Sequence, residues 1–283
     1  MSVHHPIGVF DSGIGGLSVL QSLRQAMPLE RFVYLADTAH APYGEKTDLE
    51  VRRRSHAITR FLVDQYRIKA LVVACNTATA AAIHELRAQY PQLPVVGVEP
   101  ALKPAAELTR TGRVGVMATR GTVDSEKFAR LLTRMQDQAR FEVCACNGLA
   151  LAIEQTTWPA LHNRASTEVR RLLVACTQAL GAFGTGPGQI DTLVLGCTHY
   201  VFAAPELQAL VGPDVQLVST GPAVARQTRR LLEDAGLLQD SAQNTATDAR
   251  IELLTSGHLA GLQCAAGRWL GLDAGCCHPA PVI

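Results

Sequence analysis

Leu71-Val72-Val73-Ala74-Cys75-Asn76-Thr77-Ala78-Thr79-Ala80 is the stretch that decides the fold expected for this chain. A short apolar, β-branched run ends at a cysteine, and small and hydroxyl residues then lead into an Ala-rich helical pattern. This order is typical of a buried strand followed by a helix. Ligands of open parallel α/β sheets bind at the edge formed by the carboxyl ends of the strands. The partial positive charge of a helix N-terminus at this edge favours a thiolate.

The same outline returns in the second half of the chain, at Thr192-Leu193-Val194-Leu195-Gly196-Cys197-Thr198-His199-Tyr200. An earlier strand pattern also repeats, because Gly8-Val9-Phe10 corresponds to Gly115-Val116-Met117. We therefore expect a pseudo-repeat of two α/β lobes that face each other through their strand ends. That arrangement would place the two thiols on opposite sides of one cleft, a common kind of ligand site.

Strand patterns alternate with helical patterns along the whole chain, which predicts parallel sheets built from right-handed crossovers. One loop is expected to carry Glu154, ahead of a helix over residues 161–180. Strands are expected at residues 7–10, 32–35, 71–74, 94–98, 113–118, 141–144, 192–195, 215–218 and 250–254.

Composition excludes several classes of protein. Charged residues are 18% of the chain, the formal net charge is +1, and no basic face typical of nucleic-acid binding is evident. The run Arg52-Arg53-Arg54 is interpreted as a solvated helix face. No apolar run approaches the ~20 residues of a membrane span, and the N-terminus lacks a signal-peptide pattern. We expect a cytoplasmic protein whose eight cysteines stay reduced. Most of them stand singly among apolar residues, and Cys176 is expected to be an inert core thiol.

One thiol on each side of a cleft suits a reaction that inverts a carbon centre. One group removes a proton from one face while the other returns a proton to the opposite face, so one starts as thiolate and the other as thiol. The residues after each cysteine, Asn76-Thr77 and Thr198-His199, are expected to open helices and to bind a carboxylate. Asp11 ends the first strand and is expected near Cys75, and His199 can orient or exchange protons beside Cys197.

With these stretches assembled, the chain closely resembles the cofactor-independent glutamate racemases of the aspartate/glutamate racemase superfamily. The resemblance covers about residues 6–265. It rests on Phe10-Asp11-Ser12-Gly13-Ile14-Gly15-Gly16-Leu17, Ala41-Pro42-Tyr43-Gly44, Ala74-Cys75-Asn76-Thr77-Ala78, Ala118-Thr119-Arg120-Gly121-Thr122-Val123 and Gly196-Cys197-Thr198-His199-Tyr200.

The resemblance implies a role for each matching residue. Cys75 and Cys197 would be the catalytic acid/bases, assisted by Asp11 and His199, with Glu154 as a further cleft residue. Substrate glutamate would be bound by Asp11, Ser12, Tyr43, Gly44, Asn76, Thr77, Thr119, Thr122, Thr198 and His199.

The resemblance also implies an organisation and a setting. The family fold has two α/β domains, here a discontinuous first domain of residues 1–98 and 212–283 and a second of residues 99–211. It implies a cytoplasmic homodimer that supplies D-glutamate for peptidoglycan, with no cofactor and no metal. The tail Cys276-Cys277-His278-Pro279 extends past the family's usual end and is expected to be disordered rather than to bind metal or form disulfides.

Four other functions are alternatives to glutamate racemization. Aspartate racemization would use the same two thiols, and a non-catalytic dicarboxylate-binding protein would need neither. A thiol oxidoreductase would need a close pair of cysteines. A pyridoxal phosphate enzyme requires a Schiff-base lysine, and the four lysines, Lys46, Lys69, Lys103 and Lys127, lie in apparent element flanks or a surface-like loop.

Overall fold

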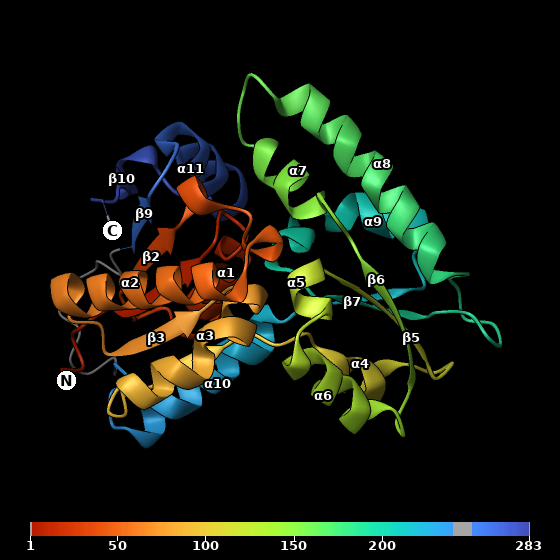
Figure 1. The fold of residues 1–283 in the computed structure, drawn as a ribbon, viewed down its shortest axis with the longest axis horizontal. Helices are drawn as coiled ribbons and strands as arrows, with labels where there is room; N and C mark the ends of the chain where they lie inside the picture. The colour runs from red at the N-terminus through yellow and green to blue at the C-terminus, as the bar shows by residue number, and fades with distance from the viewer. Residues whose placement is uncertain (1, 240–250, 283) are drawn as a thin grey trace. The chain divides into compact units, whose positions relative to one another are not determined.

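The computed structural model describes residues 2–239 and 251–282, and it divides into two compact units. The first unit runs to Val98 and resumes at Gly221, and the second runs from Glu99 to Thr220. Figure 1 colours the chain by residue number and labels its helices and strands. Each unit is built on its own parallel sheet, which confirms the predicted α/β class.

The first unit contains a six-stranded parallel sheet with the strand order β10-β9-β2-β1-β3-β4. Its strands are β1 (Ile7–Asp11), β2 (Phe32–Ala36), β3 (Ala70–Val73), β4 (Val95–Gly97), β9 (Ile251–Thr255) and β10 (Cys277–Pro279). Its α-helices are α1 (Leu17–Ala26), α2 (Asp48–Tyr66), α3 (Asn76–Gln89), α10 (Gly221–Asp234) and α11 (Leu259–Ala265).

The strand order of this sheet decides where its helices lie. The chain steps from β1 to β2 in one direction and then passes back beyond β1 to β3 and β4. Right-handed crossovers therefore put α1 on one face and both α2 and α3 on the other. The buried cluster agrees, since Ile58 of α2 and Ile83 of α3 pack with Phe10, Leu71 and Val73 of the sheet.

The second unit contains a four-stranded parallel sheet with the order β6-β5-β7-β8. Its strands are β5 (Arg113–Ala118), β6 (Arg140–Ala145), β7 (Thr192–Leu195) and β8 (Gln216–Val218). Its α-helices are α4 (Leu102–Leu108), α5 (Arg120–Val123), α6 (Glu126–Met135), α7 (Leu149–Gln155), α8 (His162–Leu180) and α9 (Ala204–Val211), and a 3₁₀ helix, η3 (Thr198–Ala203), precedes α9.

The two units repeat the same core topology. The order β2-β1-β3-β4 in the first sheet matches β6-β5-β7-β8 in the second. The register matches as well, because Phe10 pairs with Val73 just as Met117 pairs with Leu195. In each unit one further backbone bond extends the pairing past β3 or β7, from Ala74 N to Phe10 O (2.8 Å) and from Gly196 N to Met117 O (2.7 Å).

Three expectations differ from the structure. Residues 212–220 belong to the second unit rather than the first, because β8 pairs with β7. Glu154 lies in helix α7 and not in a loop. The tail is ordered, because β10 pairs in parallel with β9. The strand expected from Arg250 begins at Ile251, and Arg250 itself lies outside the described residues.

Gly196 is required by close packing between β5 and β7. A Cβ atom there would lie 2.8 Å from the carbonyl oxygen of Met117 and 3.0 Å from the Cβ of Ala118. The first of these is a backbone atom of a paired strand, which cannot rotate away. An alanine would therefore push β5 and β7 apart immediately before Cys197.

We expect Gly196→Ala to lower the free energy of unfolding by about 1–3 kcal/mol, as overpacking does elsewhere. Urea unfolding would measure the loss. Gly267→Ala is the matched control, since a Cβ there would lie 3.8 Å from the carbonyl oxygen of Leu272, an ordinary contact. Equal midpoints for the Gly196→Ala and wild-type proteins would contradict this account.

Candidate active site

Each sheet has a topological switch point, where the chain reverses its direction across the sheet. In the first unit it falls between β1 and β3, and in the second between β5 and β7. Helices leave toward opposite faces there, so the carboxyl ends of the two strands stay uncovered and form the usual ligand site of open α/β sheets. Asp11 and Cys75 lie at the first switch point, and Thr119 and Cys197 at the second.

Cys75 is the N-cap residue of helix α3. Its backbone is extended, its sulfur accepts a hydrogen bond from the backbone N–H of Ala78 (3.5 Å), and its carbonyl accepts from Thr79 (2.8 Å). A thiolate at this position receives a backbone donor and the positive end of the helix dipole. The side chain is buried, and its thiol lies 3.9 Å from the hydroxyl of Ser12.

The loop after β1 holds Asp11 and Ser12 against this cysteine. The backbone N–H of Ser12 donates to Asp11 Oδ1 (2.7 Å), and the hydroxyl of Tyr34 donates to the carbonyl of Gly13 (2.5 Å). Gly16 permits the tight turn, since a Cβ there would lie 2.7 Å from the Cβ of Asp11. Asp11, Ser12 and Cys75 are thus brought together, as the sequence predicted.

Asn76 is buried with its hydrogen-bonding capacity unused. Neither its amide nitrogen nor its amide oxygen has a hydrogen-bond partner within the described part of the chain, although the residue is only 6% exposed. A buried amide without partners costs free energy, and buried polar groups are normally satisfied. An orphaned amide beside Cys75 therefore indicates a position that a polar ligand completes.

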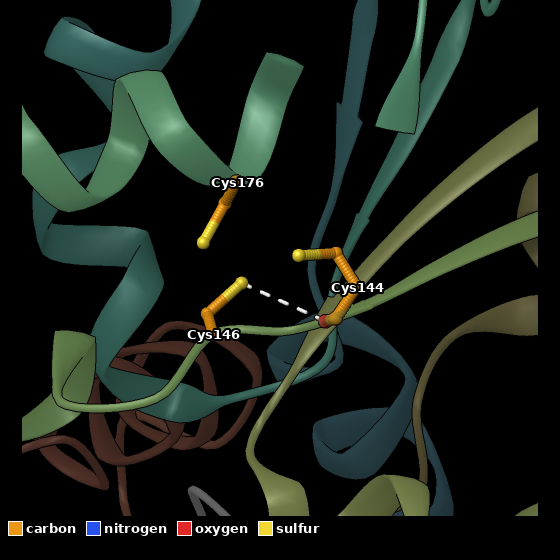
Figure 2. A group of neighbouring side chains, drawn as sticks. All are labelled: Cys144, Cys146 and Cys176. Carbon is orange, nitrogen blue, oxygen red and sulfur yellow. Dashed lines mark hydrogen bonds between the residues drawn. The ribbon is translucent and has the colours of Figure 1, made fainter. Parts of the chain in front are cut away.

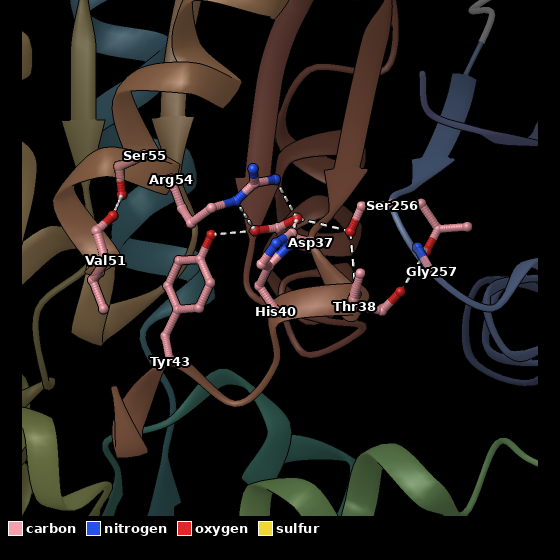
Figure 3. A network of polar contacts seen from close by, with 11 residues as sticks. Asp37, Thr38, His40, Tyr43, Val51, Arg54, Ser55, Ser256 and Gly257 are labelled. Atoms are coloured by element: carbon pink, nitrogen blue, oxygen red, sulfur yellow. Dashed lines mark hydrogen bonds and ion pairs between the residues drawn. The ribbon is translucent and has the colours of Figure 1, made fainter. Parts of the chain in front are cut away.

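Tyr43 is positioned by a buried aspartate that the sequence analysis did not select. The Tyr43 hydroxyl donates to Asp37 Oδ2 (2.6 Å), and Arg54 contacts the same carboxylate through Nε (2.9 Å) and Nη2 (2.8 Å). Ser256, after β9, donates to Asp37 Oδ1 (2.7 Å). Figure 3 shows these side chains converging on Asp37.

The Asp37 carboxylate is held in its charged form. Burial by itself opposes ionization, but hydrogen bonds from Arg54, Tyr43 and Ser256 and the charge of Arg54 outweigh it and lower the pKa of Asp37. Burial, together with Asp37 and the charge of Cys75, raises the pKa of Tyr43 far above its ordinary value, so its hydroxyl stays protonated. The prediction that Arg54 lies on a solvated face was wrong, because its side chain is only 15% exposed.

In the second unit Cys197, His199 and Glu154 form a buried chain. His199 Nδ1 lies 3.8 Å from the sulfur of Cys197, and His199 Nε2 lies 2.7 Å from Glu154 Oε2. Burial alone lowers the pKa of His199, but its hydrogen bonds to Cys197 and Glu154 raise that pKa well above the ordinary value. The ring thus lies between Cys197 and Glu154, where it can exchange a proton with Cys197.

Thr119 and Thr122 lie at the same edge of the second sheet. Thr119 caps α5, and its hydroxyl oxygen accepts from the backbone N–H of Thr122 (3.3 Å) and lies 3.0 Å from the Thr122 hydroxyl. Thr198 and His199 open a helix, as the sequence pattern predicted, and this helix is the 3₁₀ helix η3. The facing of the two cysteines across one cleft stays a prediction.

Asp37 could have been found from the sequence. It follows β2 as Asp11 ends β1, and the two residues lie at neighbouring strand ends, since Asp11 pairs with Ala36. The contact between Glu154 and His199 carried no such signal, because it joins residues that lie 45 positions apart on separate helices.

The chain is similar to known racemases over most of its length. The profile of the Asp/Glu/Hydantoin racemase family matches residues 7–228. A glutamate racemase of Stutzerimonas stutzeri (strain A1501) is 49% identical over 233 residues, which make up 82% of this chain and 84% of that relative. A glutamate racemase structure from Bacillus anthracis has a TM-score of 0.82 at 30% identity and covers 99% of this chain and 98% of its own.

A second solved structure is that of Escherichia coli glutamate racemase in complex with L-glutamate and the activator UDP-MurNAc-Ala. It has a TM-score of 0.78 at 31% identity, and the match covers 93% of this chain and 95% of that chain.

We expect Asp37→Asn to destabilise the first unit by about 3 kcal/mol, because Arg54 loses its buried partner. Because the pKa of Asp37 is lowered in the folded protein, its carboxylate stabilises the fold in full above the ordinary pKa of 3.8. This stabilisation is lost as the pH falls through the folded-state pKa. The difference between wild type and variant in urea midpoint should therefore persist at neutral pH and vanish in acid.

Glu85→Gln is the matched control for Asp37→Asn. It makes the same chemical change to a carboxylate that pairs with Arg52 (3.0 Å), but the Glu85 side chain is 48% exposed. An exposed pair contributes below about 1 kcal/mol. Equal losses in the two variants would contradict the role given to Asp37.

We expect Glu154→Gln to lower the pKa of His199, which NMR titration of labelled histidines would measure. A raised folded-state pKa stabilises the fold below the ordinary value of 6.5, and this stabilisation disappears as the pH rises through the folded-state pKa. The free energy of unfolding should therefore differ between wild type and Glu154→Gln by about 1.5–3 kcal/mol, as expected for a hydrogen bond to a charged group. This difference should become smaller at alkaline pH. Glu168→Gln, an exposed carboxylate on α8, is the control, and an unmoved His199 titration would refute the assignment.

Proposed function

The chain belongs to the Asp/Glu/Hydantoin racemase family and is an amino-acid racemase, and from this premise we propose that it interconverts L- and D-glutamate by proton transfer through Cys75 and Cys197, with no cofactor. Curated relatives whose sequences are 49% and 52% identical to this chain are glutamate racemases, which supports glutamate as the substrate.

One observation carries the proposal. Cys75 and Cys197 occupy the same position in two repeats of one topology, each two residues beyond a strand paired in the same register at a switch point. A core thiol needs no such match. Two acid/base groups acting on opposite faces of one carbon do need it, since each must approach the same Cα from its own sheet edge.

The reaction follows from the protonation states. One cysteine, as thiolate, removes the proton from Cα, and the other, as thiol, gives a proton to the opposite face, so the configuration inverts and the two sulfurs exchange charge states. His199, held by Glu154 at 2.7 Å, gives a proton to Cys197 as the imidazolium or accepts one from Cys197 as the neutral imidazole, which resets Cys197 for the next turnover. Asp11, through Ser12, has the corresponding place beside Cys75.

Binding is assigned to the groups that surround these cysteines. The orphaned amide of Asn76, with Thr77 and the backbone N–H groups that open α3, suits a carboxylate of the substrate. Ser12, Tyr43 and Gly44 complete the first unit's contribution. Thr119, Thr122, Thr198 and His199 contribute from the second unit.

Other functions are less well supported. A binding protein has no use for two matched thiols. A pyridoxal enzyme needs an available lysine, but the ammonium of Lys69 is fully buried and lies 2.6 Å from Glu30 Oε2. Among the described residues no helix is long and apolar enough to cross a membrane. We propose further that the protein acts as a cytoplasmic homodimer, without nucleic acid, and supplies D-glutamate for peptidoglycan.

The decisive experiment is incubation of the purified protein with L-glutamate in D₂O without added cofactor, followed by optical rotation and by NMR of deuterium at Cα. We expect loss of rotation as deuterium enters Cα. Cys75→Ser and Cys197→Ser should each lower the rate by roughly 10²–10⁴-fold, because each removes one acid/base group.

Cys264→Ser is the matched control, since this cysteine is exposed and lies on helix α11. A fully active Cys75→Ser protein would overturn the two-thiol mechanism. Exchange with aspartate but not with glutamate would keep the mechanism and overturn the substrate. Binding of glutamate without any exchange would support a binding protein instead.

A further inference from the structure

Three cysteines of the second unit lie together although the sequence gives them no metal-binding spacing. The sulfur atoms of Cys144, Cys146 and Cys176 all lie within 4.8 Å of one another. Cys144 is near the end of β6, Cys146 follows that strand, and Cys176 comes from helix α8, so the sheet and the helix bring them together. Figure 2 shows the three side chains of this thiol cluster converging. Cys176 lies in the core as expected, but its sulfur has two other sulfurs beside it.

We propose that this thiol cluster binds one soft, thiophilic metal ion of the Cu(I) class in a three-sulfur site. Cysteine sulfur is the ligand that selects such ions. With metal–sulfur bonds of about 2.3 Å, three sulfurs around one ion are about 4 Å apart. The observed separations therefore need less than about 1 Å of contraction. Among the described residues no histidine or carboxylate joins the cluster as a fourth ligand, which favours Cu(I) over four-coordinate zinc.

One hydrogen bond already orders the cluster. The thiol of Cys146 donates to the backbone carbonyl of Cys144 (3.6 Å), which holds these two cysteines beside each other at the end of β6. Cysteine binds a metal ion as the thiolate, so an arriving ion displaces the protons of the thiols.

Access and surroundings fit a built site. Cys144 is half-buried and gives an entry path, while Cys146 and Cys176 are 3% and 6% exposed and pack in the apolar core of the second unit. The hydroxyl of Tyr200 donates to the carbonyl of Cys146 (3.4 Å), which fixes the loop after β6. The three cysteines are not among the residues assigned to the substrate, so metal binding can be measured without an assay of racemization.

The test is anaerobic titration of the whole protein with Cu(I) buffered by a competing chelator, followed by alkylation and peptide mass spectrometry. We expect Cys144, Cys146 and Cys176 to become protected together at one equivalent of ion, while the exposed Cys264 stays reactive. Cys144→Ser removes a half-buried ligand with little risk to the fold. It should weaken binding at least about 100-fold, because even loss of an outer partner of a metal site costs roughly 10–100-fold.

Cys264→Ser, as the matched control, should bind as wild type does. Cys176→Ala tests the helix ligand independently, and the circular dichroism of each variant reports its folding. Equal alkylation of the three cysteines with and without Cu(I), or unchanged binding in folded Cys144→Ser protein, would overturn the proposal. So would a disulfide between two of these cysteines in protein purified without air. Stronger protection by Zn²⁺ at equal free concentration would overturn the ion class.

Discussion

The reversal of strand order at one point in each sheet is the constraint on which the rest of the structure depends. Right-handed crossovers place consecutive helices on opposite faces at the β1/β3 and β5/β7 boundaries, so two strand ends remain open between them. Backbone bonds continue past both boundaries, from Ala74 to Phe10 and from Gly196 to Met117. The residue that follows, a cysteine in both cases, therefore has its position set by the sheet and not by a free loop.

The two units hold their candidate site residues by different electrostatic means. In the first unit, Asp37 is kept ionized by the two-point contact with Arg54, and it uses its remaining capacity to orient Tyr43. In the second unit, hydrogen bonds to Cys197 and Glu154 raise the pKa of His199. In both cases a buried carboxylate holds the side chain that is assigned to the substrate, and its desolvation is offset by direct hydrogen bonds.

The cysteines of this chain divide by environment rather than by sequence context. Cys75 and Cys197 follow strands at open edges, where backbone donors or a histidine approach the sulfur. The cluster of Cys144, Cys146 and Cys176 is surrounded by the apolar core and by other thiols. A thiol near an open strand end can contact a substrate carbon. Thiols that are grouped with one another are instead arranged to bind a metal ion.

The sequence by itself determined the parallel α/β class, the repeat and the cysteine positions, because periodicity and strand-end residues are local signals read along the chain. Asp11 was predicted near Cys75 for the same reason, and Ser12 was implied by the family resemblance. Only the tertiary structure decided that Arg54 pairs with the buried Asp37, that Glu154 reaches His199 from a helix, and that the tail pairs as β10. These depend on contacts between distant segments, whose partners no local pattern specifies.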